Sequence, residues 1–163
     1  MNIQLTSEDL MVAATKAAIR QLMAIRKKRI GHDHGAHSKR KMAQRIGDSV
    51  IGNLGEIALS QATGKPITSH FENIKAKDID QSLEVRTTEY PNGCLLLHDT
   101  SPNDSVYVLV VVSDLNAKIC GWIEAKHGKQ QKFWKDGDPG CYYVPQSELN
   151  PISNLPVLSK ELT

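Results

Sequence analysis

The chain has 163 residues and a formal net charge of +2, enough for one domain with a buried core and too few for two. Its hydrophobic content of 40% and charged content of 23% exclude a disordered chain, and no apolar run approaches the ~20 residues of a membrane span. Three widely spaced cysteines and the absence of a secretory signal favour a reducing, cytoplasmic setting without disulfides.

The first predicted element is an amphipathic helix that begins after Thr6 and runs through Arg29. Thr6 and Asp9 have the spacing of a capping box. Apolar residues recur on one side of this helix, and a second side is basic. The basic side carries Lys16, Arg20 and Lys27.

Positive charge is concentrated in residues 26–45, which hold eight lysines or arginines against one aspartate. Such a segment either faces phosphate groups or forms a solvated helix end and loop. The candidate contacts to a DNA backbone are Arg26, Lys27, Lys28, Arg29, Lys39, Arg40 and Lys41.

The stretch "GHDHGAHS" inside this segment predicts a loop with three histidines, His32, His34 and His37. Imidazole groups suit zinc, copper or nickel. The spacing matches no structural zinc motif, and the flanking lysines repel cations. A basic loop is therefore favoured over a metal site.

A second helix is predicted over residues 39–63, ended by Gly64. One side is apolar and the other carries small residues, among them Gly52 and Gly55, and Glu56 lies among these small residues. Glycine inside a helix costs about 1 kcal/mol relative to alanine. The small side is therefore expected to pack closely against another element.

Strands follow the second helix. Residues 77–80 and 83–90 predict a hairpin, and a turn at Asn92-Gly93 leads to a further strand over 94–99. The continuous apolar run 106–113 predicts a central strand buried on both faces. Residues 118–125 alternate and are expected to pair with it, and the proline-rich tail predicts short turns and extended pieces.

The fold class that follows is α/β: two N-terminal helices and then a mixed, mostly antiparallel sheet. It is expected to form a single domain. Its parts are an N-terminal helix with the basic loop (1–44), a core (45–150) and a C-terminal tail (151–163).

Charged residues cluster at the first predicted hairpin. Residues two apart in a strand share a face, so Glu84 and Arg86 point one way and Leu83 and Val85 the other. Asp78 lies on the adjacent arm. Two acids and a base are thus expected around one spot, with Glu56 on a helix that can approach the sheet.

This order resembles the PD-(D/E)XK nuclease superfamily. "NLGEIALSQATG" (53–64) is similar to its glutamate-bearing helix, "KDID" (77–80) to its motif aspartate, and "LEVRTT" (83–88) to its (D/E)xK strand. The similarity covers roughly residues 45–150 and extends to small nuclease-fold proteins encoded by bacteriophages. It implies a restriction-endonuclease-like core, DNA as partner and a bacterial or host-cell cytoplasm.

The resemblance also implies a site for Mg²⁺ or Mn²⁺ that serves DNA phosphodiester hydrolysis. Asp78, Glu84 and the backbone carbonyl of Val85 would be the central ligands, and Glu56 a direct or outer ligand. Hard divalent cations of this kind take oxygen ligands. Asp80 has the same strand parity as Asp78 and is the alternative aspartate.

Arg86 departs from the family pattern, which usually has lysine at this position. Arginine stays protonated, so it does not serve as a general base. It could still hold the attacking water or stabilise charge on the phosphate. The alternative is a catalytically inactive nuclease-fold protein that binds DNA or other proteins. A homodimer formed through the first helix is a further expectation.

Overall fold

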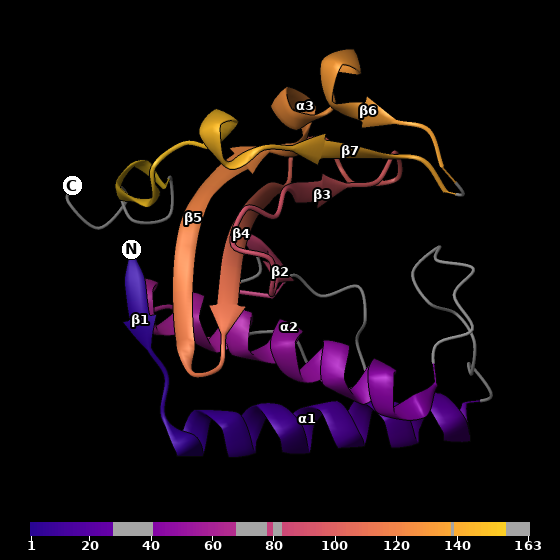
Figure 1. Cartoon of the computed structure of the whole chain (residues 1–163), viewed down its shortest axis with the longest axis vertical. Helices are drawn as coiled ribbons and strands as arrows, with labels where there is room; N and C mark the ends of the chain where they lie inside the picture. Colours follow the sequence, from indigo (N-terminus) through magenta and orange to yellow (C-terminus); the bar gives the residue numbers. More distant parts are fainter. Residues whose placement is uncertain (28–40, 68–77, 80–82, 138, 156–163) are drawn as a thin grey trace.

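The computed structural model describes residues 1–27, 41–67, 78–79, 83–137 and 139–155. It has two long helices and two sheets (Figure 1). The helices are α1 (Ser7–Arg26) and α2 (Met42–Thr63), with the short α3 (Ala125–Gly128) and the 3₁₀ turns η1 (Gln131–Phe133), η2 (Gln146–Glu148) and η3 (Ile152–Asn154) later in the chain.

The larger sheet has four strands in the order β1-β5-β4-β2. Strand β2 runs parallel to β4, and the other two pairings are antiparallel. The mixed, mostly antiparallel sheet is thus confirmed, and β2, β4 and β5 follow the two helices as predicted. Strand β1 precedes α1 and was not predicted. Its strands are β1 (Asn2–Gln4), β2 (Leu83–Thr88), β4 (Val106–Ser113) and β5 (Asn116–Glu124).

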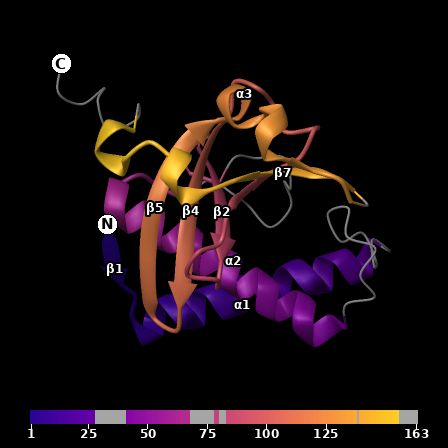
Figure 2. The ribbon, with the colours of Figure 1, turned by 45° about the horizontal axis from the view of Figure 1, so that its top comes forward.

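The second sheet is antiparallel and has the order β3-β7-β6. In Figure 2 the strands β5, β4 and β2 lie side by side, and β7 runs across them. The strands of this sheet are β3 (Leu95–Leu97), β6 (Trp134–Lys135) and β7 (Cys141–Val144).

Strand β4 is buried on both faces, as its continuous apolar sequence predicts. Val108 and Val110 pack with Leu54 of α2 in the core under the helices. Tyr107 and Leu109 pack in a separate core against the second sheet. The larger sheet therefore lies between a helical layer and a second sheet, with α1 as the outermost layer (Figure 1).

The helix boundaries follow their predicted signals where they are described. The Thr6 hydroxyl accepts the backbone N–H of Asp9 at 3.1 Å, and the Asp9 carboxylate accepts the N–H of Thr6 at 2.9 Å. Gly64 ends α2 with a φ of 67°, a left-handed conformation that favours glycine. The described helices run to Arg26 and from Met42, so the predicted bounds at Arg29 and Lys39 lie outside the described residues.

The segment 94–99 enters the fold differently from what a simple succession of hairpins suggests. The turn exists, since the N–H of Gly93 donates to the carbonyl of Tyr90 at 2.9 Å. Strand β3, however, pairs with β7 in the second sheet and not with β2. The reason is burial: Leu95 and Leu97 become fully buried in the core between the two sheets.

In the part of the chain that the structure describes, no helix combines the length and the apolar character that crossing a membrane requires.

Candidate functional site

Helix α2 reaches the larger sheet at Gly55. A Cβ atom at this position would collide with the side chain of Thr87 on β2, whereas one at Gly52 would meet nothing within 4 Å. Close packing of the small side is therefore confirmed for Gly55 and not for Gly52. The contact brings the next residue, Glu56, to the level of β2.

These two glycines give a matched test of the close packing of α2 against β2. Gly55→Ala is expected to lower the free energy of unfolding by about 1–3 kcal/mol, because the new methyl group is forced into Thr87. Gly52→Ala should raise it by up to about 1 kcal/mol, since alanine favours helix and the space is open. Urea denaturation of both variants measures the difference, and equal effects would contradict the close contact.

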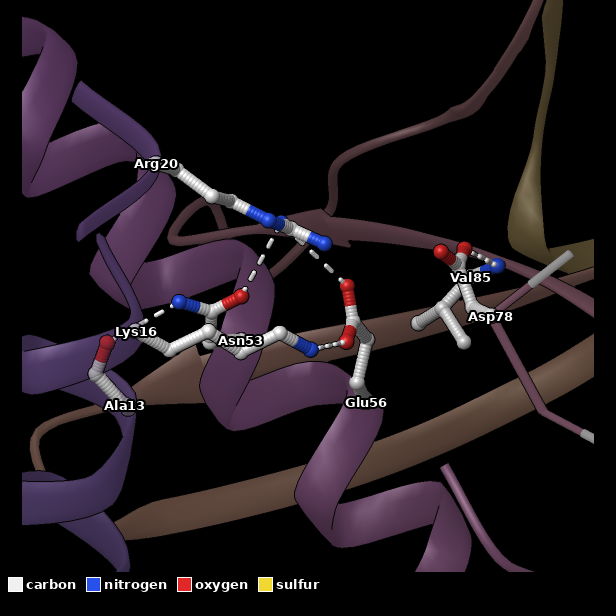
Figure 3. Close-up of polar contacts among 7 residues, drawn as sticks. All are labelled: Ala13, Lys16, Arg20, Asn53, Glu56, Asp78 and Val85. Atoms are coloured by element: carbon white, nitrogen blue, oxygen red, sulfur yellow. Dashed lines mark hydrogen bonds and ion pairs between the residues drawn. The ribbon is translucent and has the colours of Figure 1, made fainter. Parts of the chain in front are cut away.

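Glu56 is buried, with 5% of its surface exposed, and lies in a charged cluster between the two long helices (Figure 3). Lys16 Nζ lies 2.5 Å from Glu56 Oε2, and an Arg20 guanidinium nitrogen lies 3.7 Å from Oε1. Arg20 also donates to Asn53 Oδ1 at 3.1 Å. The basic side predicted for the first helix thus faces the helix acid.

Asn53 completes this cluster from within. It is 1% exposed, and its amide nitrogen donates to the carbonyl of Ala13 at 2.9 Å. Buried polar groups require such partners, so Asn53 fixes α1 against α2 at the level of Glu56. Sequence analysis identified the basic side of α1 but not Asn53, whose only signal is a polar residue next to the apolar stripe.

Asp78 lies just before β2 and is hydrogen-bonded to the edge of β2 that faces away from β4. Its backbone N–H donates to the carbonyl of Leu83 at 2.9 Å. Its carboxylate accepts the N–H of Val85 at 2.8 Å (Figure 3). The N–H and C=O of one strand residue point to the same edge. The carbonyl of Val85 therefore faces the edge at which Asp78 lies.

The electrostatics of the site centre on Asp78. The pKa of Asp78 is raised to about 6, first by burial and then by the negative charges of Glu56 and Glu84. The hydrogen bond from Val85 and the charge of Arg86 act in the opposite direction. Three carboxylates from a helix, a connecting segment and a strand therefore influence one another here.

Glu84 and Arg86 share one face of β2, as the period of the strand predicts. Leu83 and Val85 pack into the core under α2. The opposite face looks toward the second sheet, and there the Arg86 guanidinium carbon lies 5.0 Å from the ring centroid of Tyr107. Glu56 thus approaches from the helical side of the sheet and Glu84 from the other side, with Asp78 at the edge between them.

A cleft of about 600 Å³ continues from Arg86 along the same face. Among the described residues its lining is mostly apolar and aromatic, with Arg86 as the one charged side chain. Lys135 adds positive charge nearby, with its Nζ 4.7 Å from the ring centroid of Tyr143. The residues that shape the cleft include Arg86, Thr88, Tyr90, Cys94, Leu96, Leu109 and Tyr143.

The donor set fits a hard divalent cation in kind. Asp78, Glu84 and the Val85 carbonyl offer oxygen ligands, and the pKa of Asp78 is raised by burial and by the neighbouring charges of Glu56 and Glu84. Glu56 is instead paired with Lys16 and Arg20. Among the described residues, no three acidic, histidine or cysteine side chains are close enough together to hold a metal ion.

Several predicted site residues lie outside the described residues. Arg26, Lys27 and Lys41 of the basic segment are described, and the first two follow one another at the end of α1. Those outside the described residues are Lys28, Arg29, Lys39, Arg40, Asp80, His32, His34 and His37.

Comparison of this protein with protein-family models, with curated proteins and with solved structures gives no match.

Proposed function

We propose that this protein is a metal-dependent nuclease that hydrolyses DNA phosphodiester bonds. The observation that carries the proposal is the Asp78 carboxylate at the edge of β2, where it accepts the N–H of Val85. It is half-buried and influenced by both Glu56 and Glu84, and its pKa is raised to about 6. Burial accounts for the largest part of this shift. Neighbouring carboxylates add to it by repelling one another unless a cation joins them, and strongly shifted pKa values cluster at functional sites.

In this proposal Asp78, Glu84 and the carbonyl of Val85 hold Mg²⁺ or Mn²⁺. The bound ion would lower the pKa of a water molecule and neutralise charge on the scissile phosphate. Glu56, fastened to Lys16 and Arg20, lies behind this set as an outer ligand. The negative charge of Glu56 acts on the site by raising the pKa of Asp78.

Arg86 is assigned to the phosphate. Its guanidinium stays protonated, so it contributes charge and hydrogen bonds without accepting a proton. Its position over the ring of Tyr107 limits the directions in which it can reach. The positive charge of Arg86 would stabilise a phosphate beside Glu84 as negative charge develops on that phosphate in the transition state.

The path of the nucleic acid is proposed from the cleft and the basic segment. A nucleotide next to the scissile phosphate would place its base among the apolar and aromatic residues that line the cleft beyond Arg86. The DNA backbone would be contacted by Lys27 and Lys41, together with Lys28, Arg29, Lys39 and Arg40 of the basic segment. Binding of this kind is independent of sequence and weakens steeply with salt.

Calorimetry with Mg²⁺ and Mn²⁺ on wild type and Glu84→Ala tests the proposal. Wild type is expected to bind either ion and to cut supercoiled, linear or single-stranded DNA. Glu84→Ala should lose both properties, because one of the two carboxylate ligands is gone. Glu89, an exposed glutamate directly after β2, serves as the matched control, and Glu89→Ala should keep both properties. The proposal would be contradicted if wild type bound neither ion and cut none of these DNA substrates.

A second candidate is a nuclease-fold protein without catalysis that binds DNA or another protein. It is favoured by the ion pairs that hold Glu56 and by arginine in place of the motif lysine. It predicts DNA binding without metal binding or cutting. Glu84→Ala would then leave the free energy of unfolding unchanged or raise it, since repulsion from Asp78 is relieved.

A further inference from the structure

The outer face of α1 is apolar and exposed. Ala13 and Ala17 are fully buried on the side that packs against α2. On the other side, Met11, Val12 and Leu22 are 64%, 56% and 57% exposed. Figure 1 shows α1 as the outermost layer, with α2 along one side of it. Exposed apolar side chains grouped on one face of a helix mark an interaction surface.

The spacing of this face is that of a coiled-coil seam. Six positions recur at intervals of four, three, four, three and four residues, which is the alternation of heptad core positions. The four inner positions are apolar or small, and the two outer ones carry opposite charges. In chain order the seam consists of Glu8, Val12, Thr15, Ile19, Leu22 and Arg26.

We propose that α1 packs against α1 of a second copy of this chain in antiparallel orientation, forming a homodimer. A two-fold axis near residue 17 places Val12 opposite Leu22 of the partner subunit and Thr15 opposite Ile19 of the partner subunit. The same axis places Glu8 opposite Arg26 of the partner subunit. Each contact occurs twice, as in any isologous interface.

The charges at the two ends of the seam favour a second copy of α1 as the partner, and they favour the antiparallel orientation. A parallel pair would set Glu8 against Glu8 and Arg26 against Arg26, whereas the antiparallel pair joins opposite charges at both ends. Antiparallel packing also opposes the two helix dipoles. The seam spans 18 residues, or about 27 Å of helix, so the interface is small and a micromolar dimer is expected.

This inference does not rest on the proposed nuclease function. It assigns Arg26 to the partner helix and leaves Lys27 and Lys41 for DNA. Because α1 also carries Lys16 and Arg20, the dimer would fix the helix that holds Glu56.

Sedimentation equilibrium of the full chain from low to high micromolar concentration tests the dimer. Wild type is expected to shift from monomer to dimer over this range. Glu8→Arg and Arg26→Glu should each weaken the dimer at least tenfold, because each places like charges opposite one another at both ends. Mixing the two variants should restore a heterodimer, in which every end pair again has opposite charges.

Lys27→Glu is the matched control, since it makes the same charge change one residue off the seam and should leave the dimer intact. Circular dichroism verifies that the exposed substitutions leave the helices folded. A monomer at every concentration overturns the proposal, as does a dimer that Glu8→Arg and Arg26→Glu leave unchanged. A mixture of these two variants that stays monomeric overturns the antiparallel arrangement.

Discussion

Asp78→Asn is expected to stabilise the protein at pH 8 and to abolish metal-dependent cleavage of DNA. Asparagine keeps the shape of the side chain, and its carbonyl oxygen can still accept the N–H of Val85. It removes the negative charge that burial, Glu56 and Glu84 all disfavour. The same change deletes a proposed metal ligand, so stability and activity should move in opposite directions.

The size and pH range of the gain follow from the pKa of Asp78. It lies at about 6 in the folded chain against the ordinary value of 3.8. Between these values the folded state holds the proton more tightly, so the stability of wild type falls as pH rises through this window. The shift corresponds to about 3 kcal/mol. Solvent contact of the half-buried carboxyl reduces the expected loss to about 2 kcal/mol.

Urea denaturation of wild type and Asp78→Asn at several pH values between 4 and 8 measures this effect in the window set by that pKa. The stability of the variant should change less across the window and exceed that of wild type above it. Added Mg²⁺ should stabilise wild type and not the variant, because ligand binding to the folded state raises stability. Identical pH profiles would contradict the burial of Asp78 beside the two glutamates.

Much of this site is predictable from local sequence because it depends on periods that the backbone imposes. The two-residue period of β2 puts Glu84 and Arg86 on one face. The cost of glycine in a helix predicts close packing, which occurs at Gly55 against Thr87. Gly52 is also a glycine inside this helix, yet a Cβ atom there would meet nothing within 4 Å. The rule therefore identifies a helix side and not a particular residue.

The remaining features depend on how separate elements pack, which local sequence does not contain. Nothing in the strand pattern of Leu95 and Leu97 specifies the second sheet, because both sheets offer an apolar face. The pairing of Lys16 with Glu56 depends on the registration of α1 against α2. That registration is fixed in part by the hydrogen bond from Asn53 to Ala13.

Lys16→Met is expected to be the most destabilising substitution in the helix pair. The Lys16 and Glu56 side chains are 12% and 7% exposed, and methionine keeps the apolar body of the lysine while removing its charge. The buried Glu56 carboxylate would keep the Arg20 guanidinium, 3.7 Å away, as a cation contact. Removing one partner of a buried ion pair costs about 3–5 kcal/mol.

A double-mutant cycle separates the ion pair from simple packing. Glu56→Gln alone should cost less, since the lysine side chain can turn toward solvent. The double variant Lys16→Met/Glu56→Gln should recover most of the loss, because neither buried charge remains. Lys27→Met, at an exposed lysine on the same helix, is the control and should have little effect. Additive single effects would show that the two charges are not coupled.

The same variants decide what Glu56 contributes to the proposed metal site. Lys16 competes with any cation for the Glu56 carboxylate, so Lys16→Met should tighten Mg²⁺ binding if Glu56 belongs to the metal's surroundings. Glu56→Gln should weaken it, since the negative potential at Asp78 falls and the pKa of Asp78 moves toward its ordinary value. Calorimetry on both variants measures these opposite shifts. Unchanged affinity in both would confine Glu56 to holding α1 on α2 and leave Asp78 and Glu84 as the carboxylates of the site.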